Sequence, residues 1–339
     1  KGDLTGAVST ISGNDLKKVP VANVAEALTG RIAGVQVTSS EGSPDADIRI
    51  RVRGGGSLTQ DASPLIIVDG FPINSMNDIS SSDIETMTVL KDAASTAIYG
   101  SRGANGVILI TTKSGKDGKM AVNFNMFYGM KTMAKEIDVL SPEDYTKWQY
   151  EYALLAKGNA DSYEKYFGAW QDYDIYKGMK GDNWQKQIYR NATGTDHNIS
   201  AQGGNENIVY RASYGYTNMN GILKTDNFER TTVGGNVTGN FFNNHLKVEL
   251  NNKTSVMRNL YADKSAIGAA VAFDPTQPVH QDNAFGNYFQ WATGGAYEVN
   301  ASRNPVAFLE QKHNYGNSYR SIGNAQIDYK IHGWEDMKL

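Results

Sequence analysis

The hydrophobic residues in the second part of the chain alternate with polar ones. In residues 120–131, MAVNFNMFYGMK, an apolar face opposes a face rich in asparagine and glycine. The apolar positions are Val122, Phe124, Met126, Tyr128 and Met130. A period of two over this length predicts a β-strand between an apolar and a wet environment. The pattern predicts about six strands, with a seventh beginning near Met337: 120–131, 197–202, 207–218, 230–239, 246–255 and 323–331.

The connections between these strands alternate in length. Residues 132–194 and 258–318 are long insertions. The connection over 220–228 is intermediate in length, and those over 203–207, 240–245 and 332–336 are tight. A soluble β-sandwich also alternates apolar and polar residues, but it has no reason to sort its loops by side. Short turns at one rim and long loops at the other are typical of an outer-membrane barrel, so we expect antiparallel transmembrane β-barrel strands over residues 119–339.

Residues 1–118 follow a different pattern, which predicts a small domain of mixed helices and strands. The spacing of apolar residues predicts a helix over 21–30, ended by Gly30. Strands are expected at 34–40, 47–56, 65–70 and 106–113. Residues 81–100 predict a short helix capped by Ser82 or Asp83, then a strand, then a helix capped by Asp92. Along 47–56 the arginines Arg49, Arg51 and Arg53 share one face, which either binds an anion or is solvated.

Composition supports a boundary between the two parts. Phe71 and Tyr99 are the two aromatic residues of residues 1–118, whereas the chain has 11 Phe, 19 Tyr and 5 Trp. We place the domain boundary in the turn-forming segment SGKDGK, residues 114–119. No apolar run is long enough for a transmembrane helix, which does not exclude a membrane barrel.

Composition also argues against several functions. The formal net charge is −3 and no basic stripe is present, which argues against a nucleic-acid partner. There is no cysteine, and the five histidines are scattered without metal-ligand spacing. No G-x-S-x-G motif is present. We therefore expect neither an enzyme nor a metal or cofactor site.

Three glycines precede the last strand of the first part, in AIYGSRGANGVILITTK, residues 97–113. They are Gly100, Gly103 and Gly106. A dinucleotide-binding motif places its glycines after a strand and before a helix, and here the order is reversed. The spacing therefore favours a tight connection in which backbone approaches backbone.

The ordered motifs of residues 4–116 resemble a known family. GRIAGVQV, IRIRVRG, PLIIVDGFPI and DIETMTVLKDAASTAIYGSRGANGVILITTKSGK are similar to the plug domain of TonB-dependent outer-membrane transporters. Together with LTGAVSTISG they resemble the SusC/RagA subfamily. The resemblance implies an α+β plug domain over 1–118, followed by part of a plugged barrel of about 22 strands. The chain is then expected to be a fragment, with the TonB box before Lys1 and the three glycines as the turn into the last plug strand.

The resemblance also implies a function and partners. Such proteins import oligosaccharides or peptides across the outer membrane of Bacteroidetes-type Gram-negative bacteria. A SusD-like surface lipoprotein forms the lid, TonB pulls on the plug from the periplasm, and outer-membrane lipid surrounds the barrel. Two plug loops are expected to rise toward the substrate, Arg53 to Asp61 and Ile73 to Asp78. The candidate ligand residues in them are Arg53, Ser57, Leu58, Thr59, Gln60, Asp61, Asn74, Met76 and Asn77.

The first long insertion is expected to contain an aromatic helix. Ser141 is its predicted cap, Pro142 its first residue and Gly158 its end. The predicted face comprises Tyr145, Trp148, Tyr152 and Leu155. Further aromatics follow, among them Trp170, Tyr173 and Tyr176, which either contact a glycan or pack the loop.

Two other classes of protein remain open on the sequence. One is a siderophore or signalling receptor of the same architecture. The other is a soluble, aromatic-rich carbohydrate-binding protein. The aromatic loops favour a glycan over a peptide, although the same side chains suit a lipoprotein partner.

Overall fold

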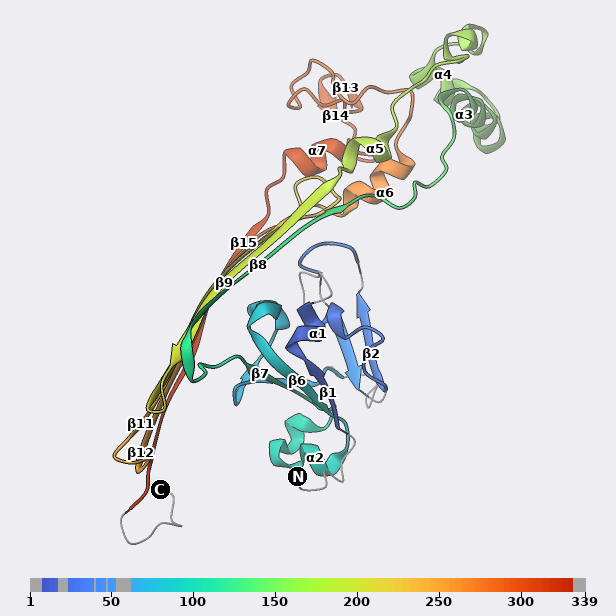
Figure 1. The fold of residues 1–339 in the computed structure, drawn as a ribbon. Helices are drawn as coiled ribbons and strands as arrows, with labels where there is room; N and C mark the ends of the chain where they lie inside the picture. The colour runs from blue at the N-terminus through green and yellow to red at the C-terminus, as the bar shows by residue number, and fades with distance from the viewer. Residues whose placement is uncertain (1–7, 18–23, 40, 47, 53–61, 332–339) are drawn as a thin grey trace.

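The computed structural model describes residues 8–17, 24–39, 41–46, 48–52 and 62–331. It contains two main sheets, which lie in separate parts of the chain (Figure 1). Residues 113–117 connect them, in the segment where the sequence places the domain boundary. The limits of the two domains stay a prediction.

The first domain is built on a five-stranded mixed sheet. Its strands, in order across the sheet, are β1 (Val8–Ser12), β6 (Ile84–Leu90), β7 (Val107–Thr112), β4 (Leu65–Val68) and β5 (Phe71–Ile73). Strands β4 and β7 are parallel, and the other neighbours are antiparallel. Strands β2 (Val35–Ser39) and β3 (Ile48–Val52) form a separate antiparallel pair. Apolar side chains of both units share one core, which includes Ile50, Ile84 and Ile108.

Short helices connect these strands. They are α1 (Gly13–Lys17), α2 (Ala93–Thr96) and the 3-10 turns η1 (Glu26–Leu28), η2 (Met76–Asp78), η3 (Ser81–Asp83) and η4 (Ala97–Gly103). Asp92 caps α2 as predicted, its carboxylate accepting from the Ser95 N–H at 2.8 Å. The predicted cap of the preceding turn is wrong: Ser80, rather than Ser82 or Asp83, accepts from the Ser82 N–H at 3.3 Å. Ser80 has the extended backbone that a cap requires.

Residues 21–23 of the predicted helix over 21–30 lie outside the described residues, and the described part of this segment is not an α-helix. The N–H groups of Ala27, Leu28 and Thr29 bond three residues back, which makes a single 3-10 turn. Gly30 follows at once with φ 70°, and a left-handed residue ends a right-handed helix. The described apolar positions of this segment, Val24, Ala25 and Leu28, are nevertheless buried as the spacing predicts.

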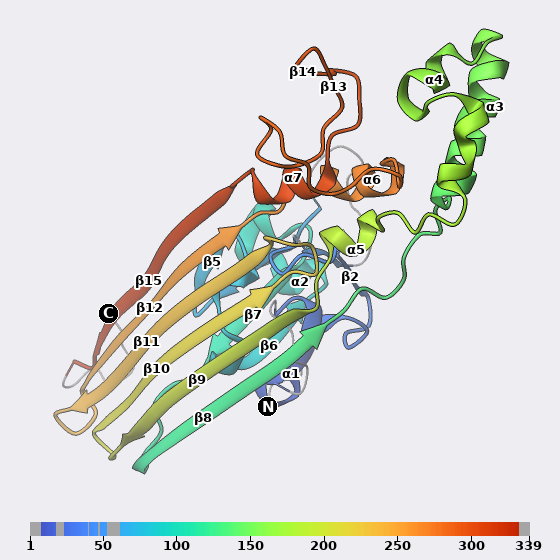
Figure 2. The ribbon, with the colours of Figure 1, turned by 90° about the horizontal axis from the view of Figure 1, so that it is seen from above.

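The second part forms a six-stranded antiparallel sheet, which we call the wall (Figure 2). Its strands, in sheet order, are β15 (Tyr315–Tyr329), β12 (Leu246–Leu260), β11 (Asn227–Phe241), β10 (Ile208–Asn220), β9 (Ala192–Gly204) and β8 (Gly118–Lys131). All six predicted strands are therefore confirmed. They are 13 to 15 residues long, more than the about 9–11 that a tilted strand needs to cross a bilayer. The position near Met337 lies outside the described residues.

The two faces of the wall are inverted relative to a soluble protein. The predicted apolar face of β8, including Phe124 and Met126, is exposed. The opposite face of the wall is polar and largely buried; its buried residues include Asn198, Ser200, Arg211, Ser213, Thr217, Arg230, Thr232 and Ser255. An apolar outside and a polar inside suit strands between lipid and a wet lumen.

The long connections lie at one end of the wall, as predicted, and the tight turns at the other (Figure 2). The connection from β8 to β9 carries α3 (Pro142–Lys157), α4 (Asp161–Phe167), η5 (Trp170–Tyr176) and α5 (Trp184–Ile188). The connection from β12 to β15 carries α6 (Ser265–Ala272), β13 (Ala292–Thr293), β14 (Ala296–Tyr297) and α7 (Pro305–Glu310). The predicted aromatic helix is α3: Ser141 caps it, and Gly158 ends it with φ 71°. In the described part of the chain, no helix is long and apolar enough to cross a membrane.

Candidate functional site

The first domain lies against the polar face of the wall (Figure 1). Four neighbouring strands each contribute one cationic side chain to this contact: Arg211 from β10, Arg230 from β11, Lys253 from β12 and Arg320 from β15. We call these four side chains the clamp. Each of them binds a carboxylate or a carbonyl group of the first domain.

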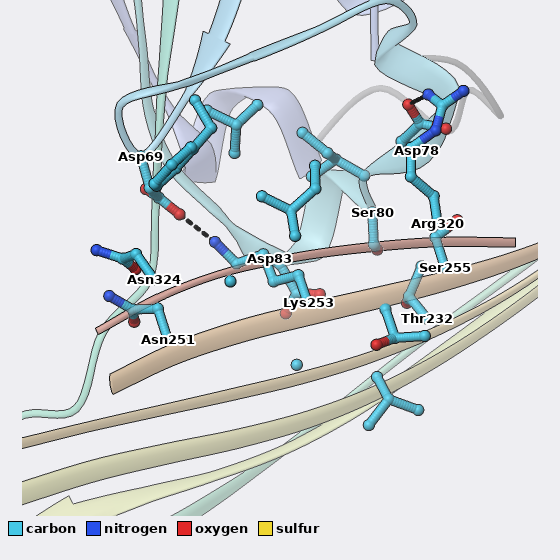
Figure 3. Close-up of a pocket in the computed structure, with 18 residues that line it drawn as sticks. Asp69, Asp78, Ser80, Asp83, Thr232, Asn251, Lys253, Ser255, Arg320 and Asn324 are labelled. Atoms are coloured by element: carbon cyan, nitrogen blue, oxygen red, sulfur yellow. Dashed lines mark hydrogen bonds and ion pairs between the residues drawn. The ribbon is translucent and has the colours of Figure 1, made fainter. Parts of the chain in front are cut away.

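The Asp69 carboxylate forms an ion pair with the Lys253 ammonium group (Figure 3). The Asp69 carboxylate also accepts from the N–H and the hydroxyl of Thr112, at 2.9 and 2.7 Å. Asp69 has φ 46°, the left-handed conformation that Asp tolerates better than most residues, and it opens the turn from β4 to β5. The V-D-G sequence thus places a carboxylate where the end of β7 and strand β12 meet.

Asp78 and Asp83 each form an ion pair with an arginine of the wall. Arg320 forms an ion pair with Asp78, whose side chain is 2% exposed (Figure 3). Arg211 and Asp83 form a second pair at 2.8 Å, and both side chains are largely buried. A buried ion pair contributes little net stability, but removing one partner leaves an uncompensated charge. Both pairs therefore restrict where the first domain can lie on the wall.

Arg230 binds the backbone rather than a carboxylate. Its guanidinium donates to the carbonyls of Asn77 and Ile79 at 2.9 and 3.1 Å, and to the Thr217 hydroxyl at 3.2 Å. The residue is 2% exposed. These contacts fix the loop around η2, which contains one of the two predicted substrate segments.

The space left between the clamp residues is small. A cavity of about 40 Å³ lies among Ile79, Ser80, Thr232 and Ser255, between the first domain and the wall. This volume holds a water molecule or two but no nutrient. A wider, open cavity of about 380 Å³ lies between the first domain and the wall beside Arg211, and its lining includes Ser82 and Ser200. At the small cavity the interface holds the first domain in place.

The predicted substrate residues are only partly described. Arg53, Ser57, Leu58, Thr59, Gln60 and Asp61 lie outside the described residues. Asn74 and Asn77 line an open cavity of about 550 Å³ on the first domain, together with Met76. The Met76 side chain is mostly buried in the core. Binding of a substrate by any of these residues stays a prediction.

The predicted loop aromatics pack against one another. Trp170 stacks on Tyr150 with ring centroids 4.0 Å apart. Tyr173 and Tyr176 are buried in the same cluster as Tyr163. In this arrangement their rings contact the loop itself, and their role toward a glycan stays a prediction.

The three glycines lie in the connection from α2 to β7. Gly100 and Gly106 have φ of 59° and 92°. A Cβ at Gly106 would lie 2.9 Å from the Val52 Cβ, and one at Gly103 would lie 2.9 Å from the Thr96 carbonyl oxygen. A side chain would therefore not fit at Gly103 or Gly106, whereas at Gly100 the space is open and the positive φ alone favours glycine.

The clamp and one further contact were missed by the sequence reasoning. The sequence signal that could have identified the clamp is an Arg or Lys among Asn, Ser, Thr and Gly on the polar face of each strand. The further contact is the ion pair between Glu41 and Lys264, next to α6. Through this ion pair, the segment around Glu41 in the first domain contacts the second long connection of the wall.

The comparisons with known proteins agree with this arrangement. Residues 1–107 match the family model of the TonB-dependent receptor plug domain. The TonB-dependent receptor SusC of Bacteroides thetaiotaomicron is 40% identical over 100% of this chain and 35% of its own length. A TonB-dependent receptor of Formosa agariphila is 33% identical over 97% of this chain and 32% of its own length. The solved RagAB peptide transporter has a TM-score of 0.78 at 25% identity, covering 97% of this chain and 40% of that chain.

A domain held against the polar face of an inverted β-sheet defines a plugged outer-membrane β-protein. The chain belongs to the TonB-dependent receptors of the SusC/RagA type, and its first domain is the plug. The outer membrane of a Bacteroidetes-type bacterium is the location that this family implies. The chain spans about a third of the length of the curated relatives named above.

Proposed function

We propose that the complete protein imports oligosaccharides, or alternatively peptides, across the outer membrane in a TonB-dependent manner. The observation that carries this proposal is the clamp, which holds the plug on the wall through polar contacts, beside an apolar contact of Ile322 from β15 with the plug core. The polar contacts can exchange for water when the plug moves, whereas a shared apolar core would resist separation. A force on the plug could therefore open a path along the wall without any covalent step.

Partners are part of the proposal. TonB supplies the force on the plug from the periplasm, and a SusD-like lipoprotein covers the extracellular side. Exposed apolar side chains near α3 support a protein partner there: Ile137, Val139, Leu140 and Leu155. Exposed apolar groups of this kind are typical of interaction surfaces.

The substrate class is supported by the aromatic content of the long connections. Aromatic rings offer flat apolar faces with polar edges, which suits sugar rings. The alternative is a peptide, because the RagAB relative is named as a peptide importer. A strain that lacks the protein distinguishes the two substrate classes. Loss of uptake of labelled glycans would support a glycan substrate, and loss of uptake of labelled peptides would support a peptide substrate.

The test uses the full-length protein in its own membrane. We expect the native polypeptide, extracted in mild detergent, to be several times larger than the 37.1 kDa of this chain and to travel with a lipoprotein. Uptake should stop when the proton gradient of the inner membrane is collapsed. Uptake that continues without the gradient, or without the protein, would contradict the proposal.

A further inference from the structure

Three segments of the chain meet at the end of the wall that carries the long connections. The first is the plug segment 41–46, which follows β2. The second is the connection 221–226 between β10 and β11, and the third is the start of α6, where Lys264 forms the ion pair with Glu41. The Ser43 hydroxyl also donates to the Glu41 carboxylate, at 2.9 Å. These contacts hold the plug segment against the wall at a place outside the clamp.

Asp226, in the second of these segments, is buried without a partner for its charge. The residue is 5% exposed. Among the described residues, no group donates a hydrogen bond to its carboxylate or forms an ion pair with it. Arg190 lies beside it, but its guanidinium donates to the backbone carbonyls of Asp226 and Gly221, at 2.7 and 3.1 Å. An ionised carboxylate in such a place is unfavourable, because burial penalises the charged form.

The charges that face Asp226 do not balance. They belong to Glu41 and Asp45 of the plug, to Lys264 at the start of α6 and to Arg190 after α5. Lys264 is already paired with Glu41 and Arg190 is bonded to carbonyl groups, so Asp45 and Asp226 are left as two carboxylates in one partly buried place. Two such groups are more stable when one of them holds a proton.

The electrostatics of the two carboxylates agree with this geometry. Burial, and after it the charge of Asp45, raises the pKa of Asp226 from 3.8 to about 6. Burial also raises the pKa of Asp45. A proton is therefore retained between the plug and the wall at a pH where an exposed aspartate has lost it.

We propose that Asp45 and Asp226 form a proton-dependent latch between the plug segment 41–46 and the connection 221–226. With a proton on the pair, the plug segment stays against the wall. When the proton leaves, the two carboxylates repel each other and the segment separates, so that both reach water. The latch goes beyond the import function, since it makes one contact of the plug sensitive to the pH on the side of the long connections.

The direction of the pH effect follows from the raised pKa of Asp226. After release, Asp226 returns to its ordinary pKa of 3.8, so the attached state binds more protons than the released state between pH 3.8 and about 6. Release therefore becomes easier as the pH rises through this window and stays constant above it. From pH 5 to pH 8, the equilibrium constant for release should increase about tenfold.

Hydrogen exchange of the full-length transporter in detergent measures the release. The reporter is the N–H of Ala46, which is 5% exposed and bonds to the Ser43 carbonyl at 3.1 Å. Its exchange rate in the wild type is divided by its rate in Asp226→Asn at the same pH, because this ratio cancels the effect of pH on the exchange chemistry. We expect the ratio to rise about tenfold from pH 5 to pH 8. A ratio that stays constant would overturn the latch.

Asp263→Asn is the matched control. Asp263 lies next to Lys264 in sequence and forms an ion pair with Lys312 at 2.7 Å. The hydrogen bond from Lys312 lowers the pKa of Asp263, so this carboxylate stays ionised from pH 5 to pH 8. The ratio of wild type to Asp263→Asn should therefore not change with pH. A change as large as that seen with Asp226→Asn would assign the response to a general loosening of the connections and overturn the latch.

A further variant tests whether the proton joins the plug to the wall. Asp45→Asn removes the plug carboxylate, so the pKa of Asp226 should fall below 6. The exchange rate of Ala46 in Asp45→Asn, divided by its rate in Asp45→Asn/Asp226→Asn, should then level off at a lower pH than the wild-type ratio does. An unchanged levelling-off pH would show that Asp226 titrates within the wall alone and would overturn the latch. None of these measurements depends on uptake, so the import proposal is tested separately.

Discussion

Removal of Arg320 should loosen the plug far more than removal of Arg320 and Asp78 together. In Arg320→Met the Asp78 carboxylate, which is 2% exposed, loses its cationic partner and stays buried. The loss of one partner of a fully buried pair costs about 3–5 kcal/mol, and because the Arg320 side chain is 35% exposed the low end of about 3 kcal/mol applies. Replacing both partners by neutral groups of similar size is close to neutral. The double variant Asp78→Asn/Arg320→Met should therefore recover most of the lost stability.

Hydrogen exchange of the full-length transporter in detergent measures this difference locally. At 1.36 kcal/mol per factor of ten, a cost of about 3 kcal/mol predicts about 10²-fold faster exchange of the protected amides of η2 and η3 in Arg320→Met. Arg258→Met is the control, because Arg258 is an exposed arginine on the neighbouring strand β12. Two results would refute the clamp as a restraint on the plug. One is unchanged amide exchange in Arg320→Met, and the other is a double variant whose loss of stability equals the sum of the losses in the two single variants.

Three further predictions concern pH, the glycine turn and the plug loops. Burial, with Asp45 nearby, raises the pKa of Asp226 from 3.8 to about 6, so its contribution to stability is complete below pH 3.8 and is lost as the pH rises through about 6. Asp226→Asn should thus be more stable than wild type by up to about 3 kcal/mol at pH 8 but not at pH 4; a difference in melting temperature that does not change with pH would contradict this. Gly106→Ala should destabilise the plug by about 2 kcal/mol or more because of its φ of 92° and the nearby Val52, whereas Gly42→Ala, with nothing within 4 Å of its Cβ, should not, as urea unfolding of the plug would show. Replacing Ser57 to Asp61 by a Gly/Ser linker should weaken uptake without loss of barrel assembly; unchanged uptake would remove this loop from the substrate path.

The wall could be predicted from the sequence because its environment acts on every residue. Lipid on one side and a wet lumen on the other impose a period of two that is visible within a single strand such as residues 120–131. The helix after Ser141 was predictable for a similar reason, since its cap, its first proline and its final glycine are local signals. Both signals lie within a few residues of the structure they produce.

The clamp could not be predicted because it joins residues that are distant in sequence. Asp78 and Arg320 are 242 positions apart, and neither has a local pattern that names the other. Arg230 binds carbonyl groups, which leave no signal in the sequence at all. Likewise, the aromatic composition of the first long connection predicted a cluster, but it could not distinguish the buried Tyr173 from the exposed Trp148, because that depends on how the loop folds.

The central claim is that the plug moves relative to the wall during import, and a reversible tether tests it directly. Ser80 of the plug and Thr232 of the wall line the same small cavity (Figure 3). Residues 1–339 contain no cysteine, and any cysteine in the rest of the full-length protein is first replaced by serine. In the full-length Ser80→Cys/Thr232→Cys variant, joined by a cleavable thiol-reactive linker, uptake should stop and should return when the linker is cleaved, while each single-cysteine variant keeps uptake. Uptake that continues with the two cysteines fully joined would contradict the account.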